Sequence, residues 1–252
     1  MPNGAFDMTD LVTIRCLTDN YAYLVHGGGQ TALIDAPEAA PILAELDRRG
    51  WGLDAILLTH HHDDHIQAVP QIVAATGATV WGNAADAARL PALDRPLTPG
   101  TPAEFCGERV EVIDVPGHTV GHVAYHLPGA GLAFTADSLM AMGCGRLFEG
   151  TPAQMWDSLS RLAALPDETL ICSGHDYARG NGAFALAVDP DNAALRQRLD
   201  ATLAGQRPAS PATLADEKAT NPFLRAAALA RPGEDAAAAF ARLRREKDGF
   251  RG

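Results

Sequence analysis

The stretch Thr59-His60-His61-His62-Asp63-Asp64-His65 places four of the nine histidines of the chain within one short segment. Imidazole and carboxylate groups are the ligands that zinc, iron and manganese accept readily. Residues 54–59 are apolar enough to predict a buried strand, so the histidines would lie in a loop on a rigid support. The pattern predicts a metal site rather than a solvated, histidine-rich turn.

The order of the ligands within this stretch favours two ions. In an extended segment, alternation points His60 and His62 the same way and His61 the other way. Asp64 and His65 are adjacent, so a single ion is not expected to take every ligand. We therefore expect two neighbouring ions.

Size, charge and cysteine usage exclude several classes of protein. A chain of 252 residues with 47% hydrophobic residues suits one large domain, or one domain with a smaller one. No stretch is long and apolar enough to span a membrane, and residues 1–7 show no signal peptide. Four dispersed cysteines fit a reducing compartment, so we expect a cytoplasmic protein. The net charge of −11 disfavours nucleic-acid binding, and no oligomerisation signal is visible, so a monomer is expected.

The chain changes character near residue 178. Before it, apolar strand patterns alternate with helical ones. Helices are expected at 38–49 and 66–76, and a third is expected to begin at Thr151, where Gln154 can close a capping box. The expected strands are 11–16, 21–26, 31–35, 54–59, 78–81, 110–115, 122–127, 131–136 and 169–173. After it, helices are expected at 191–204, 214–218 and 235–247, with a linker at 205–211. We predict an α/β domain at 1–177 and a helical domain at 178–252.

Three further segments repeat the arrangement of a strand followed by a turn with a ligand-type residue. They place His118 after 110–115, Asp137 after 131–136 and His175 after 169–173. One such residue alone is more often structural than a ligand. Together with the first cluster they form a strong set of metal ligands.

At these four positions the chain resembles the metallo-β-lactamase-fold hydrolases and, within them, the hydroxyacylglutathione hydrolase (glyoxalase II) family. The further similar segments are Asn20-Tyr21, Gly143-Cys144-Gly145-Arg146-Leu147-Phe148-Glu149-Gly150, Asn221-Pro222-Phe223-Leu224-Arg225 and Arg244-Arg245-Glu246-Lys247-Asp248. The resemblance implies a four-layer αββα sandwich with a dinuclear metal site, followed by a small C-terminal helical domain that binds the substrate.

Carried over residue by residue, the resemblance implies two metal sites. The first ion would be held by His60, His62 and His118, and the second by Asp64, His65 and His175, with Asp137 bridging both. Among them, the residues expected to take part in catalysis are His60, His62, Asp64 and Asp137. Zn²⁺ is the expected ion, with Fe or Mn as alternatives because such sites accept all three. The other histidines, expected to lie outside the coordination, are His26, His61, His122 and His126.

The resemblance also implies the reaction: hydrolysis of S-(2-hydroxyacyl)glutathione thioesters such as S-D-lactoylglutathione, in methylglyoxal detoxification. A hydroxide bridging two ions would attack, since a bound ion lowers the pKa of water to about 7. The leaving thiolate, with a pKa near ~8.5, requires no strong acid. The residues implied to bind glutathione are Arg146, Tyr177, Arg244 and Lys247, with Phe148 where many relatives carry Tyr.

Other functions remain open at this point. A glutathione persulfide dioxygenase of the same fold uses one iron and carries a similar Gly-Cys-Gly-Arg loop, and another thioesterase of this fold is a second alternative. The long helical tail with Arg244 and Lys247 argues against the dioxygenase. These two residues are three apart on the expected last helix, so they share a face on which glutathione could bind. A metal-binding protein without activity is a third class, against which the complete ligand set argues.

Overall fold

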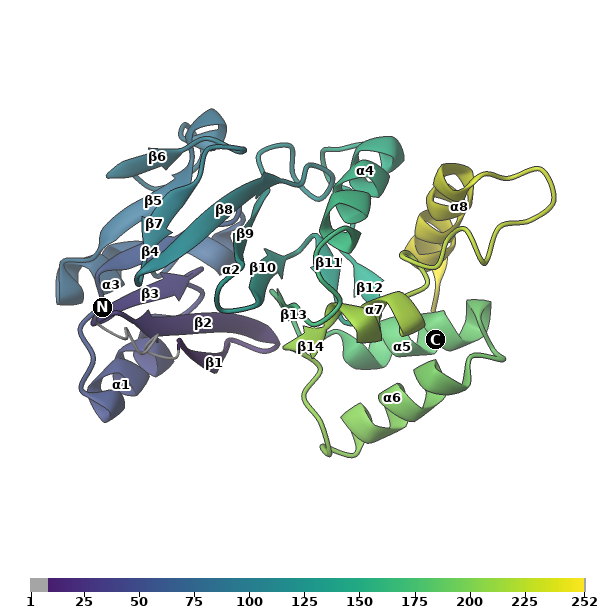
Figure 1. Ribbon diagram of the computed structural model, residues 1–252, viewed down its shortest axis with the longest axis horizontal. Helices are drawn as coiled ribbons and strands as arrows, with labels where there is room; N and C mark the ends of the chain where they lie inside the picture. The colour runs from purple at the N-terminus through teal and green to yellow at the C-terminus, as the bar shows by residue number, and fades with distance from the viewer. Residues whose placement is uncertain (1–8, 252) are drawn as a thin grey trace, which may run out of the picture. The chain divides into compact units, whose positions relative to one another are not determined.

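The computed structural model describes residues 9–251, and Figure 1 shows its helices and strands. The prediction about the N-terminal segment 1–7 therefore concerns residues outside the described part. The chain forms two compact units: unit 1 comprises Met1–Ile113 and Tyr125–Ala130, and unit 2 comprises Asp114–Ala124 and Gly131–Gly252. Among the described residues, no helix has the length and apolar character needed to cross a membrane.

Unit 1 is built on a six-stranded sheet whose strands follow the chain order. These are β1 (Asp10–Cys16), β2 (Asn20–Gly27), β3 (Gln30–Ile34), β4 (Ala55–Leu57), β5 (Thr79–Asn83) and β6 (Arg95–Leu97). The first three strands are antiparallel, and β3 to β6 run parallel. Parallel neighbours need long crossover connections, which α1 (Ala39–Arg49), α2 (Asp63–Ile66) and α3 (Val69–Thr76) provide between β3 and β5.

The core of unit 1 lies between these helices and the sheet. Ile42 of α1 and Ile72 of α3 pack in one cluster with Leu24, Leu33 and Ile56 of the strands. Further along the chain are the 3₁₀ turn η1 (Ala84–Asp86) and the antiparallel pair β7 (Ala103–Phe105) and β8 (Glu108–Asp114). Strand β9 (Val123–Leu127) begins in unit 2 and ends in unit 1. The core formed by α1, α3 and the strands of the six-stranded sheet holds β3 and β4 in place.

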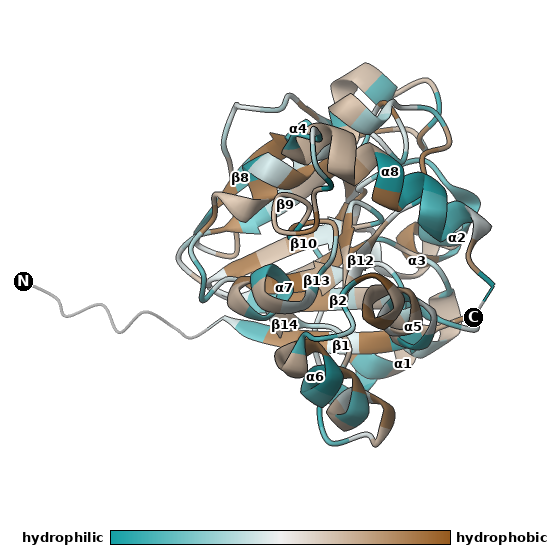
Figure 2. Ribbon diagram, turned by 90° about the vertical axis from the view of Figure 1, so that its right-hand side faces the viewer, coloured by the Kyte–Doolittle hydropathy of each residue, from teal (hydrophilic) through white to brown (hydrophobic). Residues whose placement is uncertain are grey.

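Unit 2 contains strands followed by most of the helices. Its ladder has the order β14-β13-β10, formed by β10 (Leu132–Ala136), β13 (Leu170–Ser173) and β14 (Ala212–Thr213). A separate hairpin pairs β11 (Leu139–Met140) with β12 (Gly143–Cys144). The helices are α4 (Pro152–Ala163), α5 (Ala178–Val188), α6 (Ala193–Leu203), α7 (Leu214–Thr220) and α8 (Ala236–Gly249). In Figure 2, α8 carries both hydrophilic and hydrophobic segments, and its buried side includes Phe240 and Leu243.

Most expected elements occur, with differences at their ends. The capping box of α4 is confirmed, because the side chains of Thr151 and Gln154 each bind the other's backbone. The expected helix 66–76 is wrong as one element: α2 ends at Ile66 and α3 begins at Val69, with Pro70 in its first turn. Helix α5 was not predicted, and β14 shows that strands do not end at residue 178. A two-residue strand is too short to show periodicity.

Candidate metal centre

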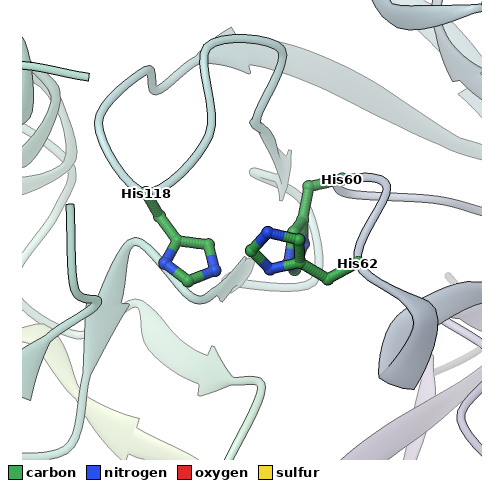
Figure 3. Close-up of side chains that lie close together, drawn as sticks. All are labelled: His60, His62 and His118. Atoms are coloured by element: carbon green, nitrogen blue, oxygen red, sulfur yellow. The ribbon is translucent and has the colours of Figure 1, made fainter. Parts of the chain in front are cut away.

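The loop after β4 gathers three imidazoles within unit 1. His60 and His65 are fully buried. The His60 ring centroid lies 4.8 Å from that of His62 and 4.2 Å from that of His65. His61, which alternation points the other way, has Nδ1 3.2 Å from Asp86 Oδ2. Figure 3 draws His60 and His62 on this loop, together with His118 from the loop that follows β8.

Asp35, at the end of β3, organises this loop. Its buried carboxylate accepts hydrogen bonds from the backbone N–H of Thr59 (2.9 Å), the Thr59 hydroxyl (2.8 Å) and Nδ1 of His65 (2.8 Å). Thr59 Oγ1 in turn lies 3.0 Å from His60 Nδ1. Because the Thr59 hydroxyl donates its hydrogen to Asp35, its oxygen accepts a hydrogen bond from His60 Nδ1. With Nδ1 engaged, Nε2 is the nitrogen that His60 and His65 each present to a metal.

Asp35 also adopts a backbone conformation that is rare for an L residue. Its φ is +56°, and left-handed backbone at a residue other than glycine costs about 1–3 kcal/mol. The three hydrogen bonds to its carboxylate offset that cost. Asp35 was not predicted as a site residue, although a carboxylate at the end of a buried strand is the same signal that indicated Asp137.

Asp64 is fixed by the start of β2. Asn20 Nδ2 donates to Asp64 Oδ2 and to the Asp64 carbonyl, both at 3.0 Å. The same Oδ2 atom lies 3.8 Å from Nε2 of His65. Asn20 therefore aims the carboxylate of Asp64 at the neighbouring imidazole, a role the sequence did not reveal although Asn20 was among the residues that resemble the family.

Unit 2 provides a second set of ligand-type residues at the ends of β8, β10 and β13. His118 Nε2 lies 3.3 Å and His175 Nε2 3.4 Å from the same oxygen, Asp137 Oδ2, and all three residues are buried. His118 Nδ1 donates to the Arg146 carbonyl at 2.8 Å. Two imidazole nitrogens thus converge on one carboxylate oxygen at distances slightly beyond an ordinary hydrogen bond, a spacing that suits ligands of a shared ion.

Two aromatic side chains stand next to these imidazoles. The Phe148 ring lies 5.3 Å from that of His118 and is 60% exposed. The Tyr177 ring stacks on His175 at 4.7 Å and is also exposed. Exposed aromatic rings on either side of a ligand set provide an apolar surface for a bound organic molecule.

The basic residues expected to bind substrate form one group in unit 2. Buried Arg244 donates through Nη1 to the Cys144 carbonyl (2.9 Å) and through Nη2 to Asp248 (2.8 Å). Arg146 Nε lies 3.8 Å from the same Asp248 oxygen, and its side chain is largely exposed. Lys247 donates to the Gly180 carbonyl at 2.7 Å, and its burial beside Arg244 lowers its pKa. Asp248 links the two arginines.

The remaining histidines and Cys144 have other surroundings. His126 Nδ1 lies 3.0 Å from Glu111, His26 stacks on Trp51, and His122 Nδ1 lies 3.2 Å from a backbone carbonyl. Burial raises the pKa of the Cys144 thiol, so the reactive thiolate is disfavoured. This thiol is poorly suited to act as a nucleophile.

The donor set fits a divalent metal ion. It consists of imidazoles, all buried except the partly exposed His62, and of carboxylates, which together are typical ligands of such ions. Three of the imidazoles have Nδ1 engaged by an oxygen of the protein. Within unit 1, ligand atoms of Asp35, His60 and His65 lie within 4.8 Å of one another. The arrangement fixes the orientation of these imidazole rings, as outer partners of metal ligands commonly do.

Asp35→Asn should weaken metal binding about 10- to 100-fold, the usual effect of losing an outer partner of a ligand. An amide has the same size as the carboxylate, but it has no negative charge and only one acceptor oxygen, so it cannot accept all three hydrogen bonds. Competition with a metal indicator measures the affinity. Asp94→Asn is the matched control, because Asp94 also accepts a backbone N–H, from Val80 at 2.8 Å. Equal affinities of the two variants would contradict the role of Asp35.

Comparison with known proteins gives consistent matches. The family model described as Metallo-beta-lactamase superfamily matches residues 17–175, and the model described as Hydroxyacylglutathione hydrolase C-terminus matches residues 176–250. The chain is 57% identical to a hydroxyacylglutathione hydrolase of Ruegeria pomeroyi and 60% identical to one of Fuscovulum blasticum, in each case over 96% of this chain and 99% of the relative.

A solved structure shows the same fold. The crystal structure of ETHE1 from Myxococcus xanthus superposes with a TM-score of 0.70 at 25% identity, covering 97% of this chain and 92% of that one. The expected α/β class, the metallo-β-lactamase fold and the C-terminal helical domain are thereby confirmed.

Proposed function

The chain belongs to the metallo-beta-lactamase superfamily and, within it, to the hydroxyacylglutathione hydrolases, and on that premise we propose that it is a metal-dependent thioester hydrolase. Its substrates are S-(2-hydroxyacyl)glutathione thioesters such as S-D-lactoylglutathione, and its products are glutathione and the 2-hydroxy acid. The observation that carries the proposal is the convergence of His118 and His175 on Asp137 Oδ2. The relatives give no support to the persulfide dioxygenase alternative. Thiol release from S-D-lactoylglutathione tests the proposal. A folded, metal-loaded sample that releases no thiol would reject it.

We propose that the chain holds two divalent ions, most simply Zn²⁺, with Fe or Mn as alternatives. The proposed ligands are His60, His62 and His118 for the first ion, Asp64, His65 and His175 for the second, and Asp137 as the bridge. When bound, such ions supply a water of lowered pKa and a Lewis acid for the thioester carbonyl. The engaged Nδ1 atoms of His60, His65 and His118 support this assignment.

The chain's own residues position the reacting groups. Asp35 and Thr59 orient the imidazoles of unit 1, and Asn20 aims Asp64. A thiolate is a weakly basic leaving group, because the thiol pKa is about 8.5, so the site needs no strong acid beside the sulfur. Phe148 and Tyr177 offer exposed aromatic faces for the apolar parts of glutathione.

We propose that residues 178–252 act as the substrate-binding domain. Glutathione carries two carboxylates, which basic groups at fixed positions recognise. Arg244 and Lys247 of this domain supply two basic groups. Arg146 and Tyr177, which precede the domain in the chain, add a third basic group and a hydroxyl. Arg146 and Arg244 both approach the same oxygen of Asp248, Arg244 from a buried position and Arg146 from an exposed one, which keeps their charges close together.

Arg244→Ala should raise KM for glutathione thioesters at least ~10-fold more than KM for a small thioester without the peptide, because charged hydrogen bonds contribute about 1.5–3 kcal/mol. Steady-state kinetics on both substrates measure the difference. Arg242→Ala is the matched control on the same helix, since Arg242 pairs with Glu234 and touches neither Cys144 nor Asp248. Equal increases for both substrates would defeat the binding role.

We further propose a role in methylglyoxal detoxification in the cytoplasm. The four cysteines are all free and buried, which suits a reducing compartment. With a net charge of −11 the chain is expected to act without a nucleic-acid partner, and we expect it to be a monomer.

A further inference from the structure

We infer that Asn221 is a positioning residue for the metal centre: it fastens the β11–β12 hairpin, and through that hairpin it holds the Arg146 carbonyl that orients His118. The inference rests on the proposed metal site. It also gives a role to Asn221, the first residue of the Asn221-Pro222-Phe223-Leu224-Arg225 segment.

Asn221 joins the two strands of the hairpin. Its Nδ2 donates to the Met140 carbonyl at 3.0 Å and to the Gly143 carbonyl at 2.8 Å, and these two residues are partners in the hairpin register. Its Oδ1 accepts from the backbone N–H of Phe223 at 3.0 Å, which fixes the orientation of the amide. Asn221 is fully buried, so each of these bonds would be costly to leave unmade.

A buried ion pair supports Asn221 from α6 and α7. Glu217 Oε2 accepts from the backbone N–H of Met142 at 3.0 Å, while Oε1 pairs with Arg198. Oε2 also lies 3.0 Å from Asn221 Nδ2, so the two hydrogens of this amide are shared among Glu217 and the two hairpin carbonyls. Met142 has a φ of +54°, which is unfavourable for a residue other than glycine. Its N–H bond to a charged acceptor helps to hold this conformation. Glu217 therefore fixes the turn while Asn221 fixes the strands.

The hairpin leads directly to the metal ligands. Gly145 follows β12, and its N–H donates to the Ser138 carbonyl at 3.1 Å. The next residue is Arg146, whose carbonyl accepts from His118 Nδ1 at 2.8 Å. Only Gly145 lies between Cys144, the end of the hairpin, and Arg146, so a displaced hairpin would displace the Arg146 carbonyl as well. Without that hydrogen bond, neither the tautomer nor the ring orientation of His118 would be fixed.

The test compares Asn221→Ala with Asn192→Ala, using Co²⁺ as the probe. Asn192 is a matched control: its Nδ2 also donates to a backbone carbonyl, that of Ala219 at 2.9 Å, and its Oδ1 caps Leu195 N–H at 3.0 Å. We expect Asn221→Ala to bind Co²⁺ at least ~10-fold more weakly and to change the visible absorption of the bound ion, because the orientation of a ligand is lost. The Asn192→Ala variant should keep the natural affinity for Co²⁺ and the natural absorption of the bound ion. An Asn221→Ala protein with normal affinity and absorption would overturn the inference.

Hydrogen exchange of the natural chain provides a second test that does not depend on the variant folding. The N–H groups of Met142 and Gly145 should exchange only with global unfolding if the hairpin is fastened; rapid exchange would overturn the inference. Neither readout involves a thioester. Normal Co²⁺ binding without thioester hydrolysis would reject only the proposed substrate, whereas a natural chain that binds no Co²⁺ would reject the metal site and this inference together.

Discussion

His60→Ala should lower kcat/KM for S-D-lactoylglutathione by more than ~100-fold and leave the protein folded. Losing an outer partner of a metal ligand already costs about 10- to 100-fold, so losing a proposed ligand should exceed that. His60 is fully buried, and its Nδ1 is held by Thr59. Only Nε2 is therefore directed toward an ion, and alanine supplies no substitute. Steady-state thiol release, with circular dichroism to verify folding, measures the effect.

The matched control is His126→Ala. His126 is also a buried histidine, but its Nδ1 pairs with Glu111 on a strand surface. The His126→Ala variant should lose stability, because it too loses a buried ring, but it should still bind metal and hydrolyse the thioester. Unchanged turnover in His60→Ala would show that the site plays no part in hydrolysis.

Gly145→Ala should abolish activity and strongly destabilise unit 2. A Cβ atom at this position would lie 1.9 Å from the carbonyl oxygen of Asp137 and 3.1 Å from Nδ1 of His118. The first neighbour is backbone, which cannot rotate aside, so the loop or the Asp137 segment must move. Overpacking commonly costs about 1–3 kcal/mol and occasionally more, and here the movement falls on two proposed ligands. Thermal unfolding and metal content after loading measure the two consequences.

Gly249→Ala is the control for this substitution, because a Cβ atom there would meet no atom within 4 Å. It should leave the melting temperature and the activity close to those of the natural chain. A Gly145→Ala protein with natural stability and full metal content would show that the loop accommodates the methyl group, and the close approach to Asp137 would then have no functional meaning.

The sequence predicted the local part of the site well. Four proposed ligands follow strands, as expected: His60 comes after β4, His118 after β8, Asp137 after β10 and His175 after β13, whereas Asp64 and His65 lie on α2. Apolar runs that end in a polar turn are visible in the chain because both signals lie within a few residues. The capping box of α4 was predictable for the same reason.

The supporting contacts could not be predicted, because they join residues far apart in the chain. Asn20 reaches Asp64 across 44 positions, and Asn221 reaches Gly143 across 78. Helical spacing placed Arg244 and Lys247 on one face, but it could not show that Arg244 would be buried with its guanidinium on the Cys144 carbonyl. Periodicity identifies which side of an element is apolar, not which element will cover it.

The most direct test of metal-dependent thioester hydrolysis is thiol release from S-D-lactoylglutathione before chelation, after chelation and after addition of Zn²⁺, Fe²⁺ or Mn²⁺ to separate samples. We expect release to stop when the metal is removed and to return when at least one ion is restored, because a bound ion supplies the reactive water. Release that continues at the same rate in protein shown to be free of metal would contradict the account.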